Sequence, residues 1–308
     1  MPELPEVETT IRDLQKKVRG RTFIDTWTDF EKIIKKPRNF QDFKKEIKNK
    51  RIKNVRRRAK FILFDLSEDK TLLIHQKLTG HLLLGKWREK GNRWVSSSPL
   101  LSDKINAYIH LLFTLDNKEM LGLSDLRKFA KVELWDSRKL SESEEMKSLG
   151  PEPLEKEFTF KRFTEILKNK KAAKGEPRQR RGKIKQVLMD QKVIAGIGNI
   201  YSDEILFEAK VNPFKLVSQL NSEELKKIYK AIIKILKIGI KLRGESISDW
   251  RTVEGKKGFF DSYRRVYQRE GEKCPRCKSI ILRKKIGGRS AHFCPKCQKL
   301  QSFCAQYF

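Results

Sequence analysis

Four cysteines near the end of the chain constrain its fold more than any other feature. They form two pairs, Cys274-Pro-Arg-Cys277 and Cys294-Pro-Lys-Cys297, with 16 residues between the pairs. This C-x2-C-x16-C-x2-C spacing is typical of a tetrahedral zinc site made of four thiolates. Two disulfides are the alternative, and we find no secretion signal that would favour them. The fifth cysteine, Cys304, lies seven residues beyond the last ligand, and we expect it to be a spare thiol.

The segment between the cysteine pairs has the pattern of a β-hairpin. Residues 280–283 and 290–293 each resemble a strand, and Gly287-Gly288 supplies a turn between them. Arg289 follows this turn directly. The hairpin would therefore hold a positive charge on a zinc-fixed scaffold, where it can clamp a phosphate. An ordinary solvated arginine is the alternative.

The charge balance is strongly one-sided. The 308 residues include 70 Lys and Arg against 39 Asp and Glu, which gives a formal net charge of +31 and a pI of about 10.0. Such an excess indicates a polyanionic partner, with nucleic acid as the first candidate and an anionic membrane surface as the alternative. We find no apolar run of 18 residues and no signal-peptide core, so we expect a soluble intracellular protein without a membrane partner.

The chain begins with Met1-Pro2-Glu3. Removal of Met1, which is usual before a small residue, would expose the secondary amine of Pro2. An α-amino group has an ordinary pKa near 7.7–8.0, so part of it is uncharged at neutral pH and can attack carbon to form a Schiff base. Glu3 beside it can donate or accept a proton. The alternative is that these residues only precede a helix, whose apolar face would be Val7, Ile11, Leu14 and Val18.

The first half of the sequence predicts a β-rich domain. Short apolar runs separated by turn residues are expected as strands at 21–29, 61–66, 71–75, 81–84, 107–115 and 131–135. This pattern favours an antiparallel sandwich or barrel. A short helix is expected at 39–48 and a polar loop at 88–104. The basic stretch Lys44–Lys60 contains ten Lys and Arg and one acid, and its end would fix a cation at a rigid strand edge.

The second half predicts helices. We expect them at 160–167, at 183–190, from about Asn199, and at 222–242, where Asn221 and Glu224 can form a capping box. Residues 168–185 hold nine Lys and Arg with one acid, and part of this stretch is expected to be a basic loop. The predicted domains are 1–137 (β-sandwich), 138–158 (linker), 159–262 (helical) and 263–308 (four-cysteine zinc finger and tail).

The segment Gly196-Ile197-Gly198-Asn199 has the pattern of a phosphate-binding turn. Two glycines allow the backbone to approach a ligand, and a helix starting near Asn199 would direct its N–H groups outward. Taken alone this signal is weak, and an ordinary turn is the alternative.

Taken together, these motifs resemble the formamidopyrimidine-DNA glycosylase family, which removes oxidised bases from DNA. The resemblance covers nearly the whole chain. It is carried by Pro2-Glu3-Leu4-Pro5-Glu6-Val7-Glu8-Thr9, Arg57-Arg58-Ala59-Lys60, Asp125-Leu126-Arg127-Lys128-Phe129, Gly196-Ile197-Gly198-Asn199-Ile200-Tyr201 and the four cysteines around Arg289. Leu4 resembles the purine-repair branch, because the endonuclease VIII branch usually has glycine there.

The resemblance implies an α+β multidomain fold. Its parts would be an N-terminal antiparallel β-sandwich with an N-terminal helix, which would be the catalytic domain (1–137), and a C-terminal helical domain of the helix–two-turns–helix type with a four-cysteine zinc-finger β-hairpin. The helical part (159–262) would be the DNA-binding domain. The partner would be double-stranded DNA with an oxidised or abasic site. One structural zinc ion and no redox cofactor are implied, in a cytoplasmic, nucleoid-associated monomer.

The resemblance also implies the catalytic residues. Pro2 would attack C1′ of the damaged nucleotide, expel the base and leave a Schiff base. Glu3 would protonate the deoxyribose ring oxygen as the ring opens. Lys60 would contact phosphate near the lesion and assist with the damaged base. Arg289 would serve the second elimination and, with Asn199, hold the kinked phosphates.

Further DNA contacts follow from the same resemblance. His110 lies where the family has a DNA-contacting histidine, and Arg180 lies where it has a DNA-contacting lysine. Arg127 and Phe129 would enter the gap left by the flipped nucleotide, together with Leu78. In a duplex C1′ is hidden, so the nucleotide must be flipped and the gap filled.

The sequence departs from the family at the gap-filling motif, which usually reads His-Leu-Gly-Met-Ser/Thr-Gly and here is His75-Gln76-Lys77-Leu78-Thr79-Gly80. Leu and Met are both apolar wedges, so we expect Leu78 to function, whereas Gln76 and Lys77 place the local DNA contact in doubt. Two alternatives stay open: the same chemistry on oxidised pyrimidines, with base preference set partly by the loop Glu254–Phe259, and a damaged-DNA-binding protein without catalysis.

Overall fold

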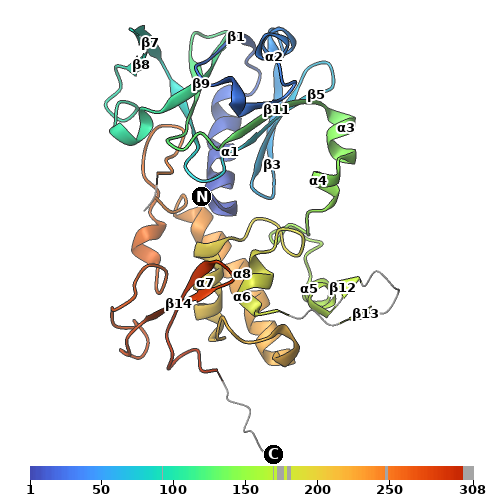
Figure 1. Cartoon of the computed structure of the whole chain (residues 1–308), viewed down its shortest axis with the longest axis vertical. Coiled ribbons are helices and arrows are strands. Elements are labelled where there is room, and N and C mark those ends of the chain that lie inside the picture. Colours follow the sequence, from blue (N-terminus) through green and yellow to red (C-terminus); the bar gives the residue numbers. More distant parts are fainter. Residues whose placement is uncertain (92, 169, 172–176, 179–181, 247–248, 301–308) are drawn as a thin grey trace, which may run out of the picture. The chain divides into compact units, whose positions relative to one another are not determined.

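The computed structural model describes residues 1–91, 93–168, 170–171, 177–178, 182–246 and 249–300 (Figure 1). The chain divides into two compact units: Met1–Ser148 with Gly239–Ser262, and Leu149–Ile238 with Tyr263–Phe308. The first unit is therefore discontinuous in sequence. The four-part domain division expected from the sequence stays a prediction.

The first unit is a β-sandwich with helices at its edges. Its helices are α1 (Leu4–Val18), η1 (Glu31–Ile33), α2 (Phe40–Ile47), η2 (Lys104–Asn106), α3 (Ser137–Glu142), α4 (Glu144–Lys147) and η4 (Phe260–Tyr263, which reaches one residue beyond the unit). Its strands are β1 (Phe23–Thr28), β2 (Ile34–Lys36), β3 (Ile52–Arg58), β4 (Phe61–Leu66), β5 (Lys70–His75), β6 (His81–Gly85), β7 (Trp87–Lys90), β8 (Arg93–Ser96), β9 (Ile109–Leu115), β10 (Met120–Ser124) and β11 (Lys131–Asp136).

Two sheets form the sandwich. One has the strand order β1-β9-β10-β6 and is antiparallel throughout. The other has the order β2-β11-β5-β4-β3 and is antiparallel except for the short parallel pair of β2 with β11. The main core contains residues from both sheets, such as Phe64 and Phe113, and from α1 and α2. The predicted antiparallel sandwich is confirmed.

Strand β9 shows how the sequence pattern sets the two faces of its sheet. Leu111, Phe113 and Leu115 belong to the main core, whereas Leu112 points to the opposite face. There it packs in a second apolar cluster that includes Trp87 of β7. Alternation of side chains along a strand makes both clusters possible.

The expectation of a loop at 88–104 is wrong for part of that segment. β7 and β8 pair as an antiparallel hairpin, with Trp87 opposite Ser96. Although most residues of the segment are polar, two tryptophans hold the hairpin in place. Trp87 is buried, and Trp94 packs against Trp27 with ring centroids 5.6 Å apart.

α1 forms because its apolar residues recur on one face and its ends match the helix dipole. Val7, Ile11, Leu14 and Val18 are all buried. Pro5 lies in the first turn, where its missing N–H costs nothing, and acidic and basic residues occupy the first and last turns respectively. In Figure 1 the helix lies beside β3.

The second unit is mainly helical. Its elements are α5 (Phe160–Lys168), β12 (Lys170–Lys171), β13 (Pro177–Arg178), α6 (Ile184–Met189), α7 (Asn199–Ala209), η3 (Val217–Gln219), α8 (Ser222–Lys241, whose last three residues belong to the first unit), β14 (Leu282–Ile286) and β15 (Arg289–Phe293). Glu224 N donates to Asn221 Oδ1 and Asn221 N donates to Glu224 Oε2, so the predicted capping box forms at the start of α8. No helix in the described ranges is long and apolar enough to cross a bilayer.

Candidate functional site

Met1 is 37% exposed, but the residues that follow it are buried in the first unit. Pro2 is buried, and Glu3 is only 2% exposed. The backbone N–H of Glu3 donates to Glu6 Oε2 at 2.8 Å. The other oxygen of the same carboxylate accepts from the backbone N–H of Glu245, also at 2.8 Å. Glu6 therefore holds the first residues against the segment that follows α8.

This arrangement needs a glycine at residue 244. Gly244 has φ +79°, and a Cβ there would approach Glu6 Cγ and Oε1 to 3.0 Å. Any side chain would both strain the backbone and displace the Glu6 carboxylate. The contact between the chain start and residues 244–245 thus depends on close backbone approach.

The electrostatic environment of the chain start favours an uncharged amine. Burial lowers the pKa of the Met1 amine below its ordinary value, although the carboxylates of Glu3, Glu6 and Glu245 act in the opposite direction. The charge of Lys60 adds to the lowering. Because only the uncharged amine has a lone pair for attack, such surroundings suit a nucleophilic amine at this position.

Lys60 is held at a rigid turn between β3 and β4. It is 5% exposed and follows Ala59, which has φ +52°. Arg57 Nη1 donates to the carbonyl oxygen of Ala59 at 3.1 Å, and Arg57 Nε donates to Glu8 Oε2 of α1 at 3.0 Å. The turn is thereby tied to the helix that begins with the chain start, which fixes where the Lys60 side chain begins; its two expected roles stay predictions.

Asp125 joins the two loops that carry the predicted gap-filling residues. Its carboxylate accepts a hydrogen bond from the Thr79 hydroxyl and one from Ala130 N at 2.8 Å. Arg127 N donates to Thr79 Oγ1 at 3.1 Å. Leu78, next to Thr79, is half-buried. The loops at 76–80 and 125–130 therefore form one connected surface.

The second of these loops presents its side chains to solvent. Arg127 is exposed, Phe129 is 50% exposed, and the Arg127 guanidinium lies 4.8 Å from the centre of the Phe129 ring. A stacked cation and aromatic ring can together enter a gap in a base stack. His110, on β9 of the same unit, hydrogen-bonds through Nδ1 with Asp29.

In the second unit, Asn199 begins α7 beside a buried ion pair. Lys185 Nζ lies 2.6 Å from Asp203 Oδ1, and both side chains are 0% exposed. The same ammonium group donates to the carbonyl oxygens of Ser290 at 2.6 Å and of Asn199 at 3.5 Å. The pair thus links α6, α7 and β15.

Asp203 also holds the cysteine hairpin. Its Oδ2 accepts from the backbone N–H of His292 at 2.9 Å and lies 3.0 Å from His292 Nδ1. Arg289 is exposed at the first position of β15, next to Ser290. The network therefore fixes the starts of α7 and β15, which carry Asn199 and Arg289.

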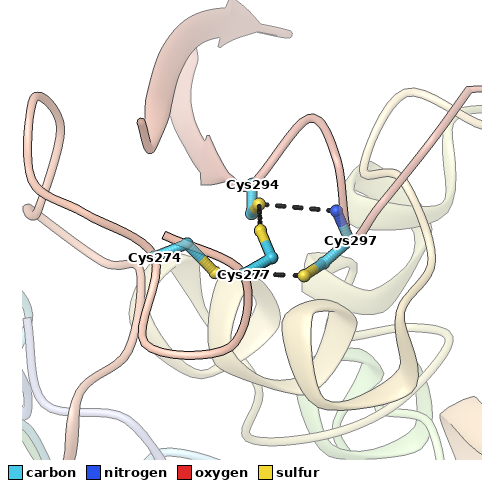
Figure 2. Close-up of side chains that lie close together, drawn as sticks. All are labelled: Cys274, Cys277, Cys294 and Cys297. Carbon is cyan, nitrogen blue, oxygen red and sulfur yellow. Dashed lines mark hydrogen bonds between the residues drawn. The ribbon is translucent and has the colours of Figure 1, made fainter. Parts of the chain in front are cut away.

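The four cysteines of the predicted zinc site lie together (Figure 2). The Sγ atoms of Cys274 and Cys297 are 3.9 Å apart, those of Cys277 and Cys294 are 3.4 Å apart, and all four lie within 4.8 Å of one another. Four thiolates around zinc, each at about 2.3 Å, would be about 3.8 Å apart. The donor set fits one tetrahedral ion.

The thiols titrate differently without a metal. Burial raises the pKa of Cys294 and Cys297, whereas hydrogen bonds with Ser279 lower the pKa of Cys277 to about 6. A metal ion binds the thiolate forms, so loading of this site would release protons.

The predicted residues fall into two sets. Pro2, Glu3, Lys60, Leu78, His110, Arg127 and Phe129 belong to the first unit, and Asn199, Arg289 and the four cysteines belong to the second. Arg180 and Cys304 lie outside the described residues. Sequence reasoning missed Glu6, Asp29, Asp125 and the Lys185–Asp203 pair as residues that position the others. Each of them also has a partner that is distant in sequence, such as Glu245 N for Glu6 and Thr79 for Asp125, and no local pattern marks those contacts.

Three family models match consecutive parts of the chain. The formamidopyrimidine-DNA glycosylase N-terminal domain matches residues 1–132, and the formamidopyrimidine-DNA glycosylase H2TH domain matches residues 149–251. A zinc finger found in FPG and IleRS matches residues 271–300.

Curated relatives match over their full length. The formamidopyrimidine-DNA glycosylase of Pelotomaculum thermopropionicum is 38% identical, covering 98% of this chain and 100% of the relative. That of Carboxydothermus hydrogenoformans is 40% identical, covering 97% of this chain and 100% of the relative.

Solved structures match over nearly the whole chain as well. The Lactococcus lactis FPG in complex with a Fapy-dG-containing DNA has a TM-score of 0.81 at 33% identity, with 97% of this chain and 100% of that chain covered. The wild-type L. lactis protein with an oxidised-pyrimidine-containing DNA has a TM-score of 0.81 at 32% identity, with the same coverage.

Proposed function

The chain belongs to the formamidopyrimidine-DNA glycosylase family, and from this membership we propose that it excises oxidised purines through a Schiff base on the amine of Pro2. Its activity is that of a DNA glycosylase and abasic-site lyase of base excision repair. The substrates we propose are 8-oxoguanine and formamidopyrimidines in duplex DNA. The complex of the related L. lactis protein with Fapy-dG supports this substrate class.

The observation that carries the proposal is the buried chain start. After removal of Met1, the Pro2 amine would occupy surroundings that lower the pKa of an amine, beside the buried Glu3. The amine attacks C1′ as the bond to the damaged base breaks. Glu3 donates a proton to the ring oxygen, the sugar ring opens, and C1′ is left doubly bonded to the proline nitrogen. β- and δ-elimination then release both phosphates and leave a one-nucleotide gap.

DNA binding is the second part of the proposal. The flipped nucleotide is stabilised by contacts of Lys60, His110, Asn199 and Arg289 with phosphates, and Arg180 adds a further contact. Leu78, Arg127 and Phe129 fill the gap in the duplex. Unstacking a nucleotide costs a few kcal/mol, which phosphate contacts offset. Arg289 additionally serves the second elimination.

The cysteine site has a structural role in this proposal. A tetrahedral ion bound by Cys274, Cys277, Cys294 and Cys297 has no position open for water, so it would hold the hairpin of Arg289 rather than activate a nucleophile. We propose a cytoplasmic, nucleoid-associated location, because the substrate is chromosomal DNA.

The second candidate is the same chemistry on oxidised pyrimidines. It is supported by the complex of the L. lactis protein with an oxidised-pyrimidine-containing DNA. Against it stands Leu4, which resembles the purine-repair branch. Comparing excision from 8-oxoguanine and oxidised-pyrimidine duplexes under identical conditions decides between them.

The test is reductive trapping with borohydride on a duplex that contains 8-oxoguanine opposite cytosine. We expect a covalent protein–DNA product for the wild type. It should be absent for Pro2→Gln, in which a larger second residue retains Met1 and moves the amine by one residue. Pro5→Ala, a proline substitution three residues further on, is the matched control and should still be trapped.

The binding-only alternative predicts a different result. If wild-type protein binds lesion DNA tightly but is trapped on neither oxidised-base nor abasic duplexes, the glycosylase mechanism is wrong. Trapping that persists in Pro2→Gln would overturn the role of Pro2 alone.

A further inference from the structure

Asp29 lies against the ring of His110 where β1 ends. β1 and β9 are antiparallel neighbours, with Thr28 opposite Leu111, so the residue after β1 lies beside His110. His110 Nδ1 is 2.8 Å from Asp29 Oδ1 and 3.1 Å from Oδ2. One ring nitrogen thus faces both oxygens of the carboxylate.

The backbone around this pair is also fixed. The Thr28 hydroxyl donates to the carbonyl oxygen of His110 at 2.6 Å and accepts from Phe30 N at 3.1 Å. Lys128 Nζ lies 5.0 Å from the centre of the Phe30 ring. The Asp29 turn is therefore connected to β9 on one side and to the loop of Arg127 and Phe129 on the other.

The geometry leaves one ring nitrogen for a ligand. The His110 side chain is 10% exposed. Within the described part of the chain, its Nε2 has no hydrogen-bond partner, and it is not among the buried atoms that lack one. Nε2 is thus the nitrogen that an incoming group can reach.

A phosphate imposes a chemical condition on that nitrogen. Phosphate oxygens accept hydrogen bonds, so Nε2 must carry a proton to bind one. If Nδ1–H is already donated to Asp29, a ring that also donates from Nε2 is an imidazolium. Its charge is then balanced by the Asp29 carboxylate at 2.8 Å.

The negative charge of Asp29 should by itself oppose DNA binding, so the effect of removing it tests the role of this residue. Its side chain is 40% exposed, in a chain whose net charge is +31. A carboxylate beside a DNA-contacting residue repels phosphate, so on electrostatics alone its removal should strengthen binding. Weaker DNA binding after removal of the Asp29 charge would therefore point to the effect of Asp29 on His110.

We propose that Asp29 is a positioning residue for DNA binding. It orients the His110 ring by accepting from Nδ1 and thereby makes Nε2 a pre-oriented donor to a DNA phosphate. The inference rests on the proposed function, in which His110 contacts DNA.

The test compares two acid-to-amide variants of the full-length, zinc-loaded protein. Binding is measured to a duplex with a tetrahydrofuran abasic-site analogue, which cannot be cleaved. Asp29→Asn removes the negative charge that balances the imidazolium, although the amide oxygen can still accept from Nδ1. It should weaken binding by about 2- to 12-fold, the factor that corresponds to about 0.5–1.5 kcal/mol. Asp25→Asn is the control: Asp25 lies on β1, four residues before Asp29, is 55% exposed and pairs with Lys44. It should bind as the wild type or more tightly.

A double-mutant cycle separates positioning from a structural effect. In a His110→Ala background, Asp29→Asn should no longer weaken binding. Ring ¹⁵N chemical shifts give an independent signature: the chain has four histidines, and the His110 signals are those that vanish in His110→Ala. We expect Asp29→Asn to shift Nδ1 of His110 while the other three histidines are unchanged.

The outcomes are distinguishable. If His110→Ala binds as tightly as the wild type, the phosphate role of His110 in the proposed function is wrong. If His110→Ala weakens binding but Asp29→Asn strengthens it or leaves it unchanged, only the positioning role of Asp29 is overturned. If Asp29→Asn weakens DNA binding equally in the presence and in the absence of His110, the positioning role of Asp29 is overturned as well.

Discussion

His75, the half-buried last residue of β5, packs its ring edge-on against Phe61 at 4.8 Å between centroids. Burial lowers the pKa of His75 to about 3, and the nearby charges of Lys77, Lys60 and Lys131 add to this effect. Its Nδ1 accepts a hydrogen bond from Lys77 N at 2.9 Å. The folded protein therefore holds this ring neutral at pH values where the unfolded chain protonates it.

This predicts acid-dependent stability. Between about pH 6.5 and 3 the unfolded state binds the proton and the folded state does not, so the free energy of unfolding falls as the pH is lowered through this window, by on the order of 5 kcal/mol in total. Urea denaturation at several pH values should show it. His75→Asn, which keeps an acceptor for Lys77 N, should have a shallower pH dependence by up to one proton. An unchanged slope in that variant would contradict the assignment.

The buried side-chain amide of Gln76 is not satisfied by hydrogen bonds within the described residues. It is 1% exposed, and neither Oε1 nor Nε2 has a partner among the described residues. A buried amide without partners costs about 1–3 kcal/mol. Gln76→Leu, which restores the residue usual in the resembled motif, should therefore raise the free energy of unfolding by about that amount.

Thermal denaturation of Gln76→Leu and Gln76→Glu provides the comparison. The glutamate variant has the same length but buries a charge, so it should be less stable than the wild type. If the leucine variant were also less stable, Gln76 would have a partner, such as an ordered water molecule. The DNA affinity of Gln76→Leu, compared with that of the wild type, then shows whether the Gln76 amide contacts the DNA.

The resemblance to the family predicted the groups that we propose to react, and left out those that hold them. The cysteines are visible in the sequence because of their spacing, and Pro2 and Glu3 are visible because they belong to a motif that resembles the family. Glu6 resembles any acid in the first turn of a helix. Its hydrogen bond to Glu245 N spans 239 residues, and only the folded chain reveals it.

At the scale of elements, the Lys185–Asp203 pair is the connection to test. It links α6, α7 and β15 through side chains with 0% exposure. Lys185→Met would leave Asp203 buried without its cation, and removal of one partner of a buried pair typically costs about 3–5 kcal/mol. Lys192→Met, an exposed lysine after α6, should have little effect.

A second variant separates stability from position. In Lys185→Met/Asp203→Asn the buried charge is gone, so part of the stability should return in chemical denaturation. DNA affinity should stay low, because the ammonium group no longer joins the carbonyl oxygens of Asn199 and Ser290. Full recovery of both stability and affinity would mean that the pair does not position these residues.

Elements were predicted well where the apolar pattern is regular. α1 and α8 have continuous buried stripes, so periodicity found both. β3 was not predicted as a strand, because exposed basic residues alternate with buried Ile52 and Val55. The β7–β8 hairpin was missed because its stability comes from tryptophans packed on another strand, a contact that average polarity does not show.

At the scale of the whole molecule, the net charge of +31 predicts a strong salt dependence of DNA binding. Each neutralised phosphate releases counterions and contributes a slope of about −0.9 to the plot of log affinity against log salt. We expect a slope of about −3.6 for a lesion duplex, because four of the proposed phosphate contacts come from side chains that carry a positive charge: Lys60, His110 as an imidazolium, Arg180 and Arg289. Titrations by fluorescence anisotropy at several salt concentrations measure it.

Arg289→Gln is the matched comparison for this titration. Loss of one phosphate contact should make the slope shallower by about one. A slope near zero for the wild type would show that the charge excess serves something other than DNA binding.

The first unit is completed by residues 239–262, which are synthesised after most of the second unit, and this order affects folding on the ribosome. A nascent chain that ends at residue 148 lacks two hydrogen-bond partners of the sandwich. Glu245 N donates to the Glu6 carboxylate, and Val253 O accepts from Leu84 N at 2.7 Å. At typical elongation rates the missing segment begins to emerge only on the order of 5–20 s later. The sandwich must wait that long in an incomplete form, and a gene fragment cut after residue 148 would encode a domain that lacks its final piece.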